Sequence, residues 1–129
     1  MEYWRDEHRV HLVAYHLVWC PKRRKPVLTG AVARDCERVI RGVCSERRWE
    51  VIRVGVQPDH VHLFVRACPS TPAAEIARWC KGRSSRVLRR EHPHLLRLPS
   101  LWTRSFFCST VRNVSQQTVD RYIATQRRR

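Results

Sequence analysis

The sequence predicts one α+β domain, in which a β-α-β-β-α-β order forms an antiparallel sheet with two helices on one face and an added C-terminal helix. Two observations support this prediction: segments rich in β-branched and aromatic residues alternate with segments whose apolar residues recur at helical spacing. The 129 residues suit one compact domain, and a hydrophobic content of 43% supplies a core. Because the chain has no internal repeat, linker or shift in composition, we expect the domain to span residues 1–129.

The first half of the chain predicts a strand, a helix and a hairpin. Residues 10–20 (VHLVAYHLVWC) are typical of a strand that stops at Pro21, where a basic loop begins. Residues 30–48 place apolar side chains at helical spacing, which predicts an amphipathic helix. The hairpin is predicted from a strand, a turn and a second strand at residues 49–57, Pro58-Asp59 and 60–67.

The second half predicts another helix, a fourth strand and the C-terminal helix. Ser70-Thr71-Pro72 offers a hydroxyl cap and a proline at the first helical position, and this helix is expected to run to Arg90. Residues 101–111 are typical of a strand, and Ser115 is expected to cap a last helix of roughly ten residues. This order is that of ferredoxin-like and RRM-like domains, so the fold alone does not choose a function.

The charge of the chain indicates a polyanionic partner. The net charge is +15, and 23 of the 26 basic residues are arginine, whose guanidinium group binds phosphates in a bidentate manner. The alternative is a basic surface that only keeps the protein soluble.

Other function classes are disfavoured by what the sequence lacks. No apolar stretch approaches the length of a membrane span, and no signal peptide opens the chain, so we expect a cytoplasmic protein without a membrane partner. No glycine-rich phosphate loop is present, so no nucleotide cofactor is expected. The six cysteines, at positions 20, 36, 44, 68, 80 and 108, form no CxxC pair and are expected to be reduced, buried residues.

The most specific local feature is the segment Asp59-His60-Val61-His62 at the start of the 60–67 strand. Side chains alternate between the faces of a strand, so His60 and His62 point the same way, close enough to share one cation. Neutral imidazoles are common ligands of divalent metals. Two histidines on a solvated face, with no metal role, are the alternative for such a short pattern.

A second feature lies on the predicted last helix, where Tyr122 and Gln126 are four residues apart and share a helix face. A tyrosine hydroxyl can act as a covalent nucleophile towards phosphate, and a divalent ion would stabilise the charge that develops there. Tyr122 could instead serve only to dock the helix. His16 lies on the first predicted strand, and we expect a hydrogen-bonded structural histidine there rather than a ligand.

Together these residues make the sequence resemble the single-tyrosine HUH transposases of small bacterial and archaeal insertion sequences. The resemblance follows the family's order along nearly the whole chain. It is carried by YHLVWCPKRRKPVLTG (15–30), VQPDHVHLFV (56–65), AEIARWCKGRSSRVL (74–88), LWTRSFF (101–107) and VSQQTVDRYIATQ (114–126).

The resemblance implies a single-stranded DNA transposase that cuts and rejoins strands at the ends of an insertion sequence through a 5′-phosphotyrosine intermediate. Tyr122 would be the nucleophile, while His60, His62 and Gln126 would bind Mg²⁺ or Mn²⁺. Family members recognise DNA hairpins at the element ends. The candidate hairpin contacts lie in the basic loop and the second helix, at Lys22, Arg23, Arg24, Lys81, Arg83, Ser84 and Arg86.

The resemblance also implies a homodimer, in which Tyr122 and Gln126 of one subunit reach the histidines of the other in at least one state. Two other interpretations of the sequence are alternatives to a transposase. One is a non-catalytic nucleic-acid-binding module of RRM-like fold, which explains the charge but not the joint occurrence of the histidines, Tyr122 and Gln126. The other is a domesticated relative that acts on chromosomal repeats.

Overall fold

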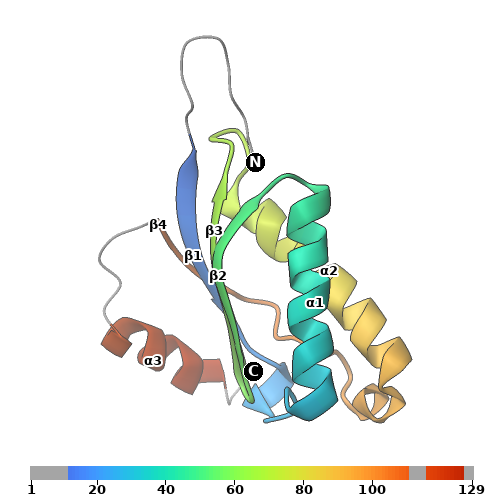
Figure 1. The fold of residues 1–129 in the computed structure, drawn as a ribbon. Helices are drawn as coiled ribbons and strands as arrows, with labels where there is room; N and C mark the ends of the chain where they lie inside the picture. The colour runs from blue at the N-terminus through green and yellow to red at the C-terminus, as the bar shows by residue number, and fades with distance from the viewer. Residues whose placement is uncertain (1–11, 111–115, 127–129) are drawn as a thin grey trace.

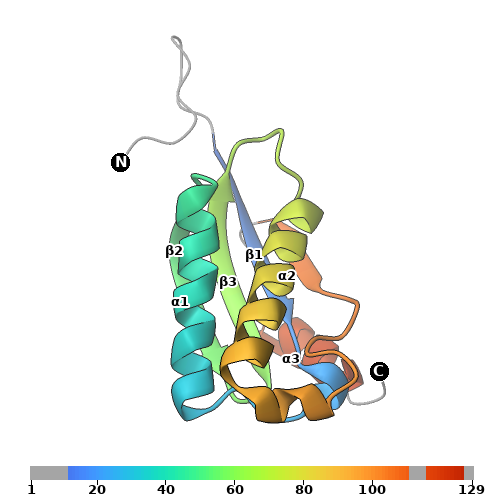
Figure 2. The same cartoon turned by 90° about the vertical axis from the view of Figure 1, so that its right-hand side faces the viewer.

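The computed structural model describes residues 12–110 and 116–126, and these form a four-stranded antiparallel sheet with helices on both faces. The sheet order is β2-β3-β1-β4, which confirms the predicted α+β class. Helices α1 and α2 lie side by side on one face, while α3 lies on the other (Figures 1 and 2). The elements are β1 (Val13–Trp19), α1 (Gly30–Glu46), β2 (Glu50–Gln57), β3 (His60–Ala67), α2 (Ala73–Glu91), β4 (Phe107–Thr110) and α3 (Gln116–Thr125), with 3₁₀ turns η1 (Lys22–Arg24) and η2 (Pro93–Arg97).

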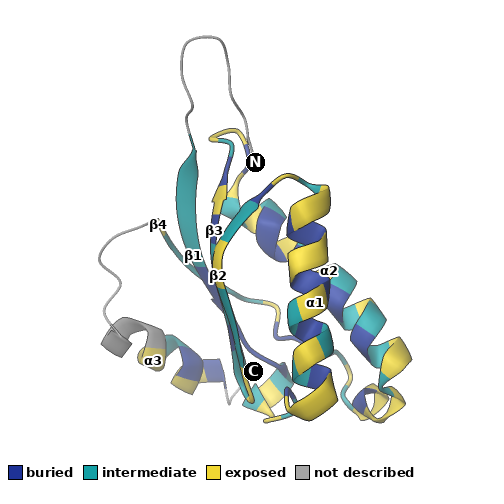
Figure 3. Ribbon diagram, viewed as in Figure 1, coloured by how far each residue is buried: buried dark blue, intermediate teal, exposed yellow. Residues whose placement is uncertain are grey.

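The two faces of the sheet differ because side chains alternate along β1 and β3. Leu17 on β1 and Leu63 on β3 are paired across the ladder, and both side chains are fully buried against α1 and α2. The next residues, Val18 and His62, are also paired and point to the opposite face. Figure 3 shows the buried sides of the helices turned towards the sheet. The pleat therefore separates a hydrophobic core from the face that carries the histidines.

Helices α1 and α2 form because their apolar residues repeat on one side. Val32, Cys36, Val39 and Ile40 of α1 are buried, as are Ile76 and Cys80 of α2. Helix α1 ends where Arg48 takes a left-handed conformation, with φ of 61°, and the Trp49 amide donates a hydrogen bond to the Cys44 carbonyl. This turn directs the chain back along the sheet into β2.

The strand predicted at residues 101–111 is shorter in the structure. Only Phe107–Thr110 pair with β1, and residue 111 lies outside the described residues. Farther back, the backbone of Trp102 forms an isolated antiparallel bridge with Pro21, beyond the end of β1, and its indole Nε1 donates to the Lys81 carbonyl and to Ser84 Oγ. This anchor fixes the segment to α2 before it joins the sheet.

Two smaller predictions differ from the structure, and a third falls outside the described residues. Strand β1 begins at Val13, with residues 10 and 11 outside the described part of the chain. Helix α2 begins at Ala73, so Pro72 occupies the capping position and no side chain caps the helix. Ser115, the predicted cap of the last helix, lies outside the described residues.

The cysteines are free thiols, and four of the six are buried, as expected. Cys68 and Cys108 are only half-buried, which corrects the prediction for these two. Cys68 follows the end of β3, and Cys108 lies on the edge strand β4, so neither position is covered on all sides. Across the residues that the structure describes, no helix is long and apolar enough to cross a membrane.

Candidate active site

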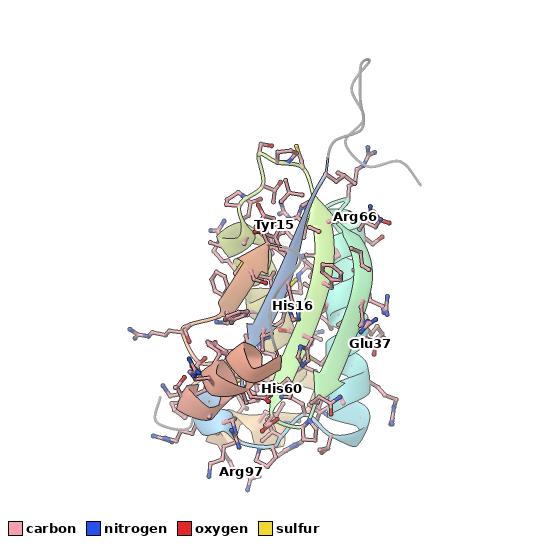
Figure 4. The ribbon with its side chains drawn as sticks, turned by 90° about the vertical axis from the view of Figure 1, so that its left-hand side faces the viewer. Tyr15, His16, Glu37, His60, Arg66 and Arg97 are labelled. Atoms are coloured by element: carbon pink, nitrogen blue, oxygen red, sulfur yellow. The ribbon has the colours of Figure 1, made fainter. Side chains whose placement is uncertain are left out.

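The predicted histidine pair lies at the start of β3, on the face of the sheet opposite α1 and α2 (Figure 4). The Nε2 atoms of His60 and His62 face each other 2.9 Å apart, and both side chains are half-buried. The residues between and after them, Val61 and Leu63, are fully buried on the other face. The alternation inferred from the sequence therefore brings the two imidazoles together as predicted.

His60 is held at its other ring nitrogen by a carboxylate. Its Nδ1 lies 2.8 Å from Oδ1 of Asp59, the preceding residue in the β2–β3 turn. The second carboxylate oxygen of Asp59 forms an ion pair with Arg24 in η1, with Oδ2 and Nε 3.1 Å apart. In the neutral tautomer whose Nδ1–H donates to Asp59, the lone pair of His60 lies on Nε2, where it faces His62.

His62 is held differently, by a second imidazole. Its Nδ1 lies 3.4 Å from Nε2 of His16 on β1, and the two rings are stacked with centroids 5.6 Å apart. Burial, together with the nearby His60 and His16, lowers the pKa of His62 to about 4. His62 is therefore neutral at pH 7, which is the form that binds a metal.

The geometry of the pair fits a divalent metal. Two adjacent ligand atoms of an octahedral ion, each about 2.1 Å from it, are separated by about 3.0 Å, close to the Nε2–Nε2 distance of 2.9 Å. Among the described residues, no three His, Cys, Asp or Glu side chains gather into a metal-binding group. The third ligand expected from the sequence, the amide oxygen of Gln126, is of another type.

Helix α3 packs on the same face of the sheet as the histidines. Ile123 is buried against Val18 of β1 and Cys20 just after it, and the ring of Tyr122 lies 5.8 Å from that of Phe107 on β4. The carboxylate of Asp120 acts to raise the pKa of His62, although burial outweighs it, so the start of α3 is within electrostatic range of β3. Figure 4 shows α3 crossing this face next to His60.

Tyr122 and Gln126 are brought together by one serine. Ser105 Oγ lies 3.1 Å from the Tyr122 hydroxyl and donates a 3.0 Å hydrogen bond to Oε1 of Gln126. The backbone at Ser105 is fixed in turn by Lys81, whose ammonium donates to the carbonyls of Thr103 and Ser105 at 2.7 and 3.0 Å. The predicted nucleophile and third ligand therefore share an anchor on the segment before β4.

The predicted DNA-binding residues fall into two places. Lys22, Arg23 and Arg24 form η1, at the end of the sheet where β3 begins, and Arg23 is exposed. Arg24 is already paired with Asp59, beside His60. This part of the predicted DNA-binding set is brought next to the histidines.

The α2 members of that set lie on the far side of the sheet. Arg86 is exposed, while Arg83 makes a bidentate ion pair with Glu46 of α1 at 3.1 and 3.2 Å. Lys81 and Ser84 face inward: Ser84 is fully buried and donates to the Cys80 carbonyl, and burial lowers the pKa of Lys81 to about 8. In this arrangement, Ser84 and Lys81 join α2 to the segment before β4 rather than forming a surface.

Several residues of the site could not be found from the sequence pattern. Ser105 and Asp59 act through contacts with side chains that a periodicity argument does not place.

On α2, a hollow of about 280 Å³ is lined by Arg78, Trp79, Gly82, Arg83 and Arg86. The guanidinium of Arg47 lies 3.5 Å over the ring of Trp79. The only sequence signal for this hollow is a tryptophan within a helix that carries no acidic residue between positions 76 and 90.

Known proteins show the same combination of sequence and fold. The family model of IS200-like transposases matches residues 9–126. ISDra2 transposase TnpA from Deinococcus radiodurans is 34% identical over 120 residues, covering 91% of this chain and 86% of the relative. The transposase of insertion sequence element IS200 from Salmonella typhimurium is 25% identical over 100 residues, covering 75% and 66% of the two chains.

Two solved structures are also similar. A transposase structure from Deinococcus radiodurans superimposes with a TM-score of 0.87 and 29% identity, covering 95% of this chain and 97% of the other. The structure of a REP-associated tyrosine transposase bound to a REP hairpin gives a TM-score of 0.57 and 18% identity, covering 95% and 68%. At that identity the second likeness concerns the fold alone.

Proposed function

This chain belongs to the IS200-like transposase family, and on that premise we propose that it cuts and rejoins single-stranded DNA at insertion-sequence ends through Tyr122. The observation that supports this activity most directly is the facing Nε2 pair of His60 and His62, on the same sheet face as the helix that carries the tyrosine. A non-catalytic nucleic-acid-binding domain has no need of that arrangement.

The proposed chemistry is a phosphodiester exchange. The Tyr122 oxygen attacks phosphorus, a phosphorus–Oη bond forms, and the bond from phosphorus to the 3′ oxygen of the preceding nucleotide breaks. The phenolic proton is balanced by the proton that the departing 3′ oxygen takes up, which leaves a 3′-hydroxyl and a 5′-phosphotyrosine. A 3′-hydroxyl can later attack such a junction, so the bond energy is retained and no nucleotide cofactor is required.

His60 and His62 would hold a Mg²⁺ or Mn²⁺ ion through Nε2, with the Gln126 amide oxygen as the third protein ligand. Such an ion, when bound, would polarise the scissile phosphate and offset the charge that develops on its oxygens. The protein's own part is to orient the imidazoles. Asp59 does this for His60 through its contact with Nδ1.

We assign the phosphate contacts of a DNA hairpin to the exposed cations of η1 and of the α2 hollow. Arg23 lies beside the site, and Arg78 and Arg86 are exposed on α2. The α2 hollow lies on one face of the sheet and η1 lies at the end of the sheet, so one duplex stem can be held on α2 while a strand extends around η1 to the histidines. A relative of this fold is described as bound to a REP hairpin, which agrees with this type of partner.

The experiment that tests the activity uses end-labelled hairpin DNA with a single-stranded flank, incubated with the protein and Mg²⁺ and resolved on a denaturing gel. We expect a covalent protein–DNA adduct with the wild-type chain. Tyr122→Phe removes one oxygen and keeps the ring against Phe107, so it is expected to bind the hairpin normally and form no adduct. An adduct formed by this variant at the wild-type rate would exclude Tyr122 as the nucleophile, and binding without any wild-type adduct would favour a binding module.

We also propose a homodimer in which Tyr122 and Gln126 reach the partner's His60 and His62 in at least one state. Its support is that α3 is attached to its own sheet by a small cluster around Ile123 and by Ser105, contacts that another copy can replace. Mixing Tyr122→Phe with His60→Ala under subunit exchange is expected to restore adduct formation. Proven exchange without recovery would reject the trans arrangement and leave the chemistry intact.

A further inference from the structure

His16 contacts the proposed metal ligand His62 without being part of the ligand set. Its Nε2 lies 3.4 Å from Nδ1 of His62, on the side of the ring away from His60. We propose that His16 is a positioning residue, which holds the His62 ring and lets its proton reside on Nδ1 so that Nε2 offers a lone pair. This inference rests on the proposed metal role of His60 and His62.

Four side chains form a continuous series of contacts along which ring protons can be placed: Asp59, His60, His62 and His16. When the His60 ring binds a metal through Nε2, that atom carries no proton and the ring proton lies on Nδ1, where Asp59 accepts it. At 2.9 Å, two bare lone pairs repel, so one of the two Nε2 atoms carries a proton whenever no cation lies between the rings. A cation bound to both Nε2 atoms requires the tautomer of His62 with its proton on Nδ1.

His16 suits this exchange because a neutral imidazole nitrogen can either donate or accept. When His62 Nδ1 is bare, His16 Nε2–H can donate to it; when His62 Nδ1 carries the proton, a bare His16 Nε2 accepts it. An apolar side chain at this position would leave Nδ1 of His62 unpaired in either state.

The fold keeps the two rings in register. Val18 is the ladder partner of His62, and Phe64 is the ladder partner of His16, so His16 lies diagonally across from His62 on the same face. The two imidazoles are nearly parallel, at 10°, and Phe64 meets His16 edge-on at 6.2 Å. Both histidines are therefore placed by backbone pairing between β1 and β3, which gives the contact a fixed geometry.

Two substitutions separate the hydrogen bond from the ring stacking. His16→Phe keeps a flat ring against His62 and removes the polar atom, whereas His16→Gln loses the ring and keeps a side-chain amide that can donate or accept at a similar reach. Phe64→Leu is the matched control, because it alters the packing around His16 and leaves the hydrogen bond in place. Thermal unfolding and hairpin binding confirm that each variant is folded.

The readout is the affinity for Mn²⁺ without DNA, followed by the signal of free Mn²⁺ in electron paramagnetic resonance. We expect His16→Phe to weaken binding roughly 10- to 100-fold, as loss of a partner to a ligating histidine does, with His16→Gln and Phe64→Leu within about threefold of wild type. Wild-type affinity in His16→Phe, or an equal loss in His16→Gln, would overturn the inference. If wild type binds no Mn²⁺ and forms no adduct, the proposed function has failed instead.

A second measurement applies if His16→Phe does not fold. Long-range ¹H–¹⁵N spectra of the wild-type protein in saturating Mg²⁺ identify which ring nitrogen of each histidine carries the proton. We expect the proton of His16 on Nδ1, so that Nε2 is free to accept from His62. A proton on His16 Nε2 under these conditions would contradict the positioning role.

Discussion

Strand β3 and helix α3 contribute to the same site but are held in very different ways. β3 is hydrogen-bonded to β2 on one side and β1 on the other, and its alternate residues are buried in the main core. In the described residues, α3 is attached through a cluster of three buried side chains, with Phe107 and Tyr122 at its edge, and through Ser105. The candidate metal ligands are therefore fixed by the backbone, whereas the candidate nucleophile is fixed by a few side chains.

In the proposed reaction, this difference would give the metal ligands and the nucleophile different mobility. Metal ligands must keep their separation to within a fraction of an ångström, which a central strand ensures. A nucleophile that takes on DNA and later releases it must approach and withdraw, and a small docking cluster permits this at a low cost in free energy. Four predictions test this contrast, from the largest expected effect to the smallest.

The largest effect is expected from removing a metal ligand on β3. His60→Ala should lower the rate of adduct formation by at least roughly a hundred- to a thousand-fold, because electrostatic stabilisation of the phosphate is lost. Hairpin binding should be nearly unchanged, since arginine contacts dominate affinity. Gel assays measure both, and EDTA should reproduce the result with wild type. His94→Ala, at an exposed histidine on η2, is the control; cleavage that continues in excess EDTA would refute a metal role.

The second effect concerns stability and compares matched deletions in the two regions. Leu63→Ala should lower the free energy of unfolding by about 2–5 kcal/mol, because it leaves a cavity in the main core. Ile123→Ala should lower the free energy of global unfolding by about 1 kcal/mol or less, because α3 can detach while the sheet stays folded. Urea unfolding measures the global change, and hydrogen exchange should accelerate in residues 120–126 alone. Equal losses for the two variants would show that α3 is part of the same cooperative unit.

The third effect is the pH dependence of stability in EDTA. Burial lowers the pKa of His62 from 6.5 to about 4 in the folded protein, so the unfolded chain binds the proton first as the pH falls. The stabilisation that a neutral His62 confers is therefore complete above pH 6.5 and is lost between pH 6.5 and 4. Relative to His62→Gln, the free energy of unfolding of the wild type should fall by up to about 3 kcal/mol over this range. The fall should be smaller than this upper value because the His62 ring is only half-buried. Parallel stability curves for the two proteins would contradict this assignment.

The smallest effect separates binding from catalysis on the α2 side. Arg86→Gln should flatten the slope of log affinity against log salt by about one phosphate contact, without changing the rate of adduct formation at saturating DNA. Arg41→Gln is the control, since Arg41 pairs with Glu37 on the outer face of α1 and is expected to leave the slope unchanged. A slower saturated rate in Arg86→Gln would connect the α2 surface to the chemistry across the sheet.

The fold was largely predictable because hydrophobic periodicity governs it. The alternation that buries Val61 and Leu63 is also what places His60 and His62 together, so one sequence pattern predicted both the sheet and the histidine pair. The end of the chain was less predictable, since only Phe107–Thr110 of the predicted strand pair with β1, while the indole of Trp102 is held by a contact with α2. No local pattern encodes such a contact, because its two partners are about twenty residues apart and meet only in the folded protein.

The same limit applies to the side chains that support the site. His16 was expected to be a hydrogen-bonded histidine of a strand, and it is, but its partner His62 lies 46 positions away. Lys81 and Ser84 were assigned to DNA from their place in a basic segment, whereas a helix has an inner face as well as an outer one. Basic residues along a helix can be assigned to a binding surface only when the buried face of that helix is known.

The alternation along β3 also constrains the lengths of chain that this site tolerates. A strand has two faces, so inserting or deleting a single residue between Asp59 and Leu63 reverses the face of every side chain on one side of the change. The histidines would then be driven towards α1 and α2, and valines or leucine would take their place beside α3. Many substitutions can preserve this arrangement, but a change of one residue in length cannot. Natural variants with an altered length in this strand are therefore expected to gain or lose two residues, or to carry a bulge that restores the parity.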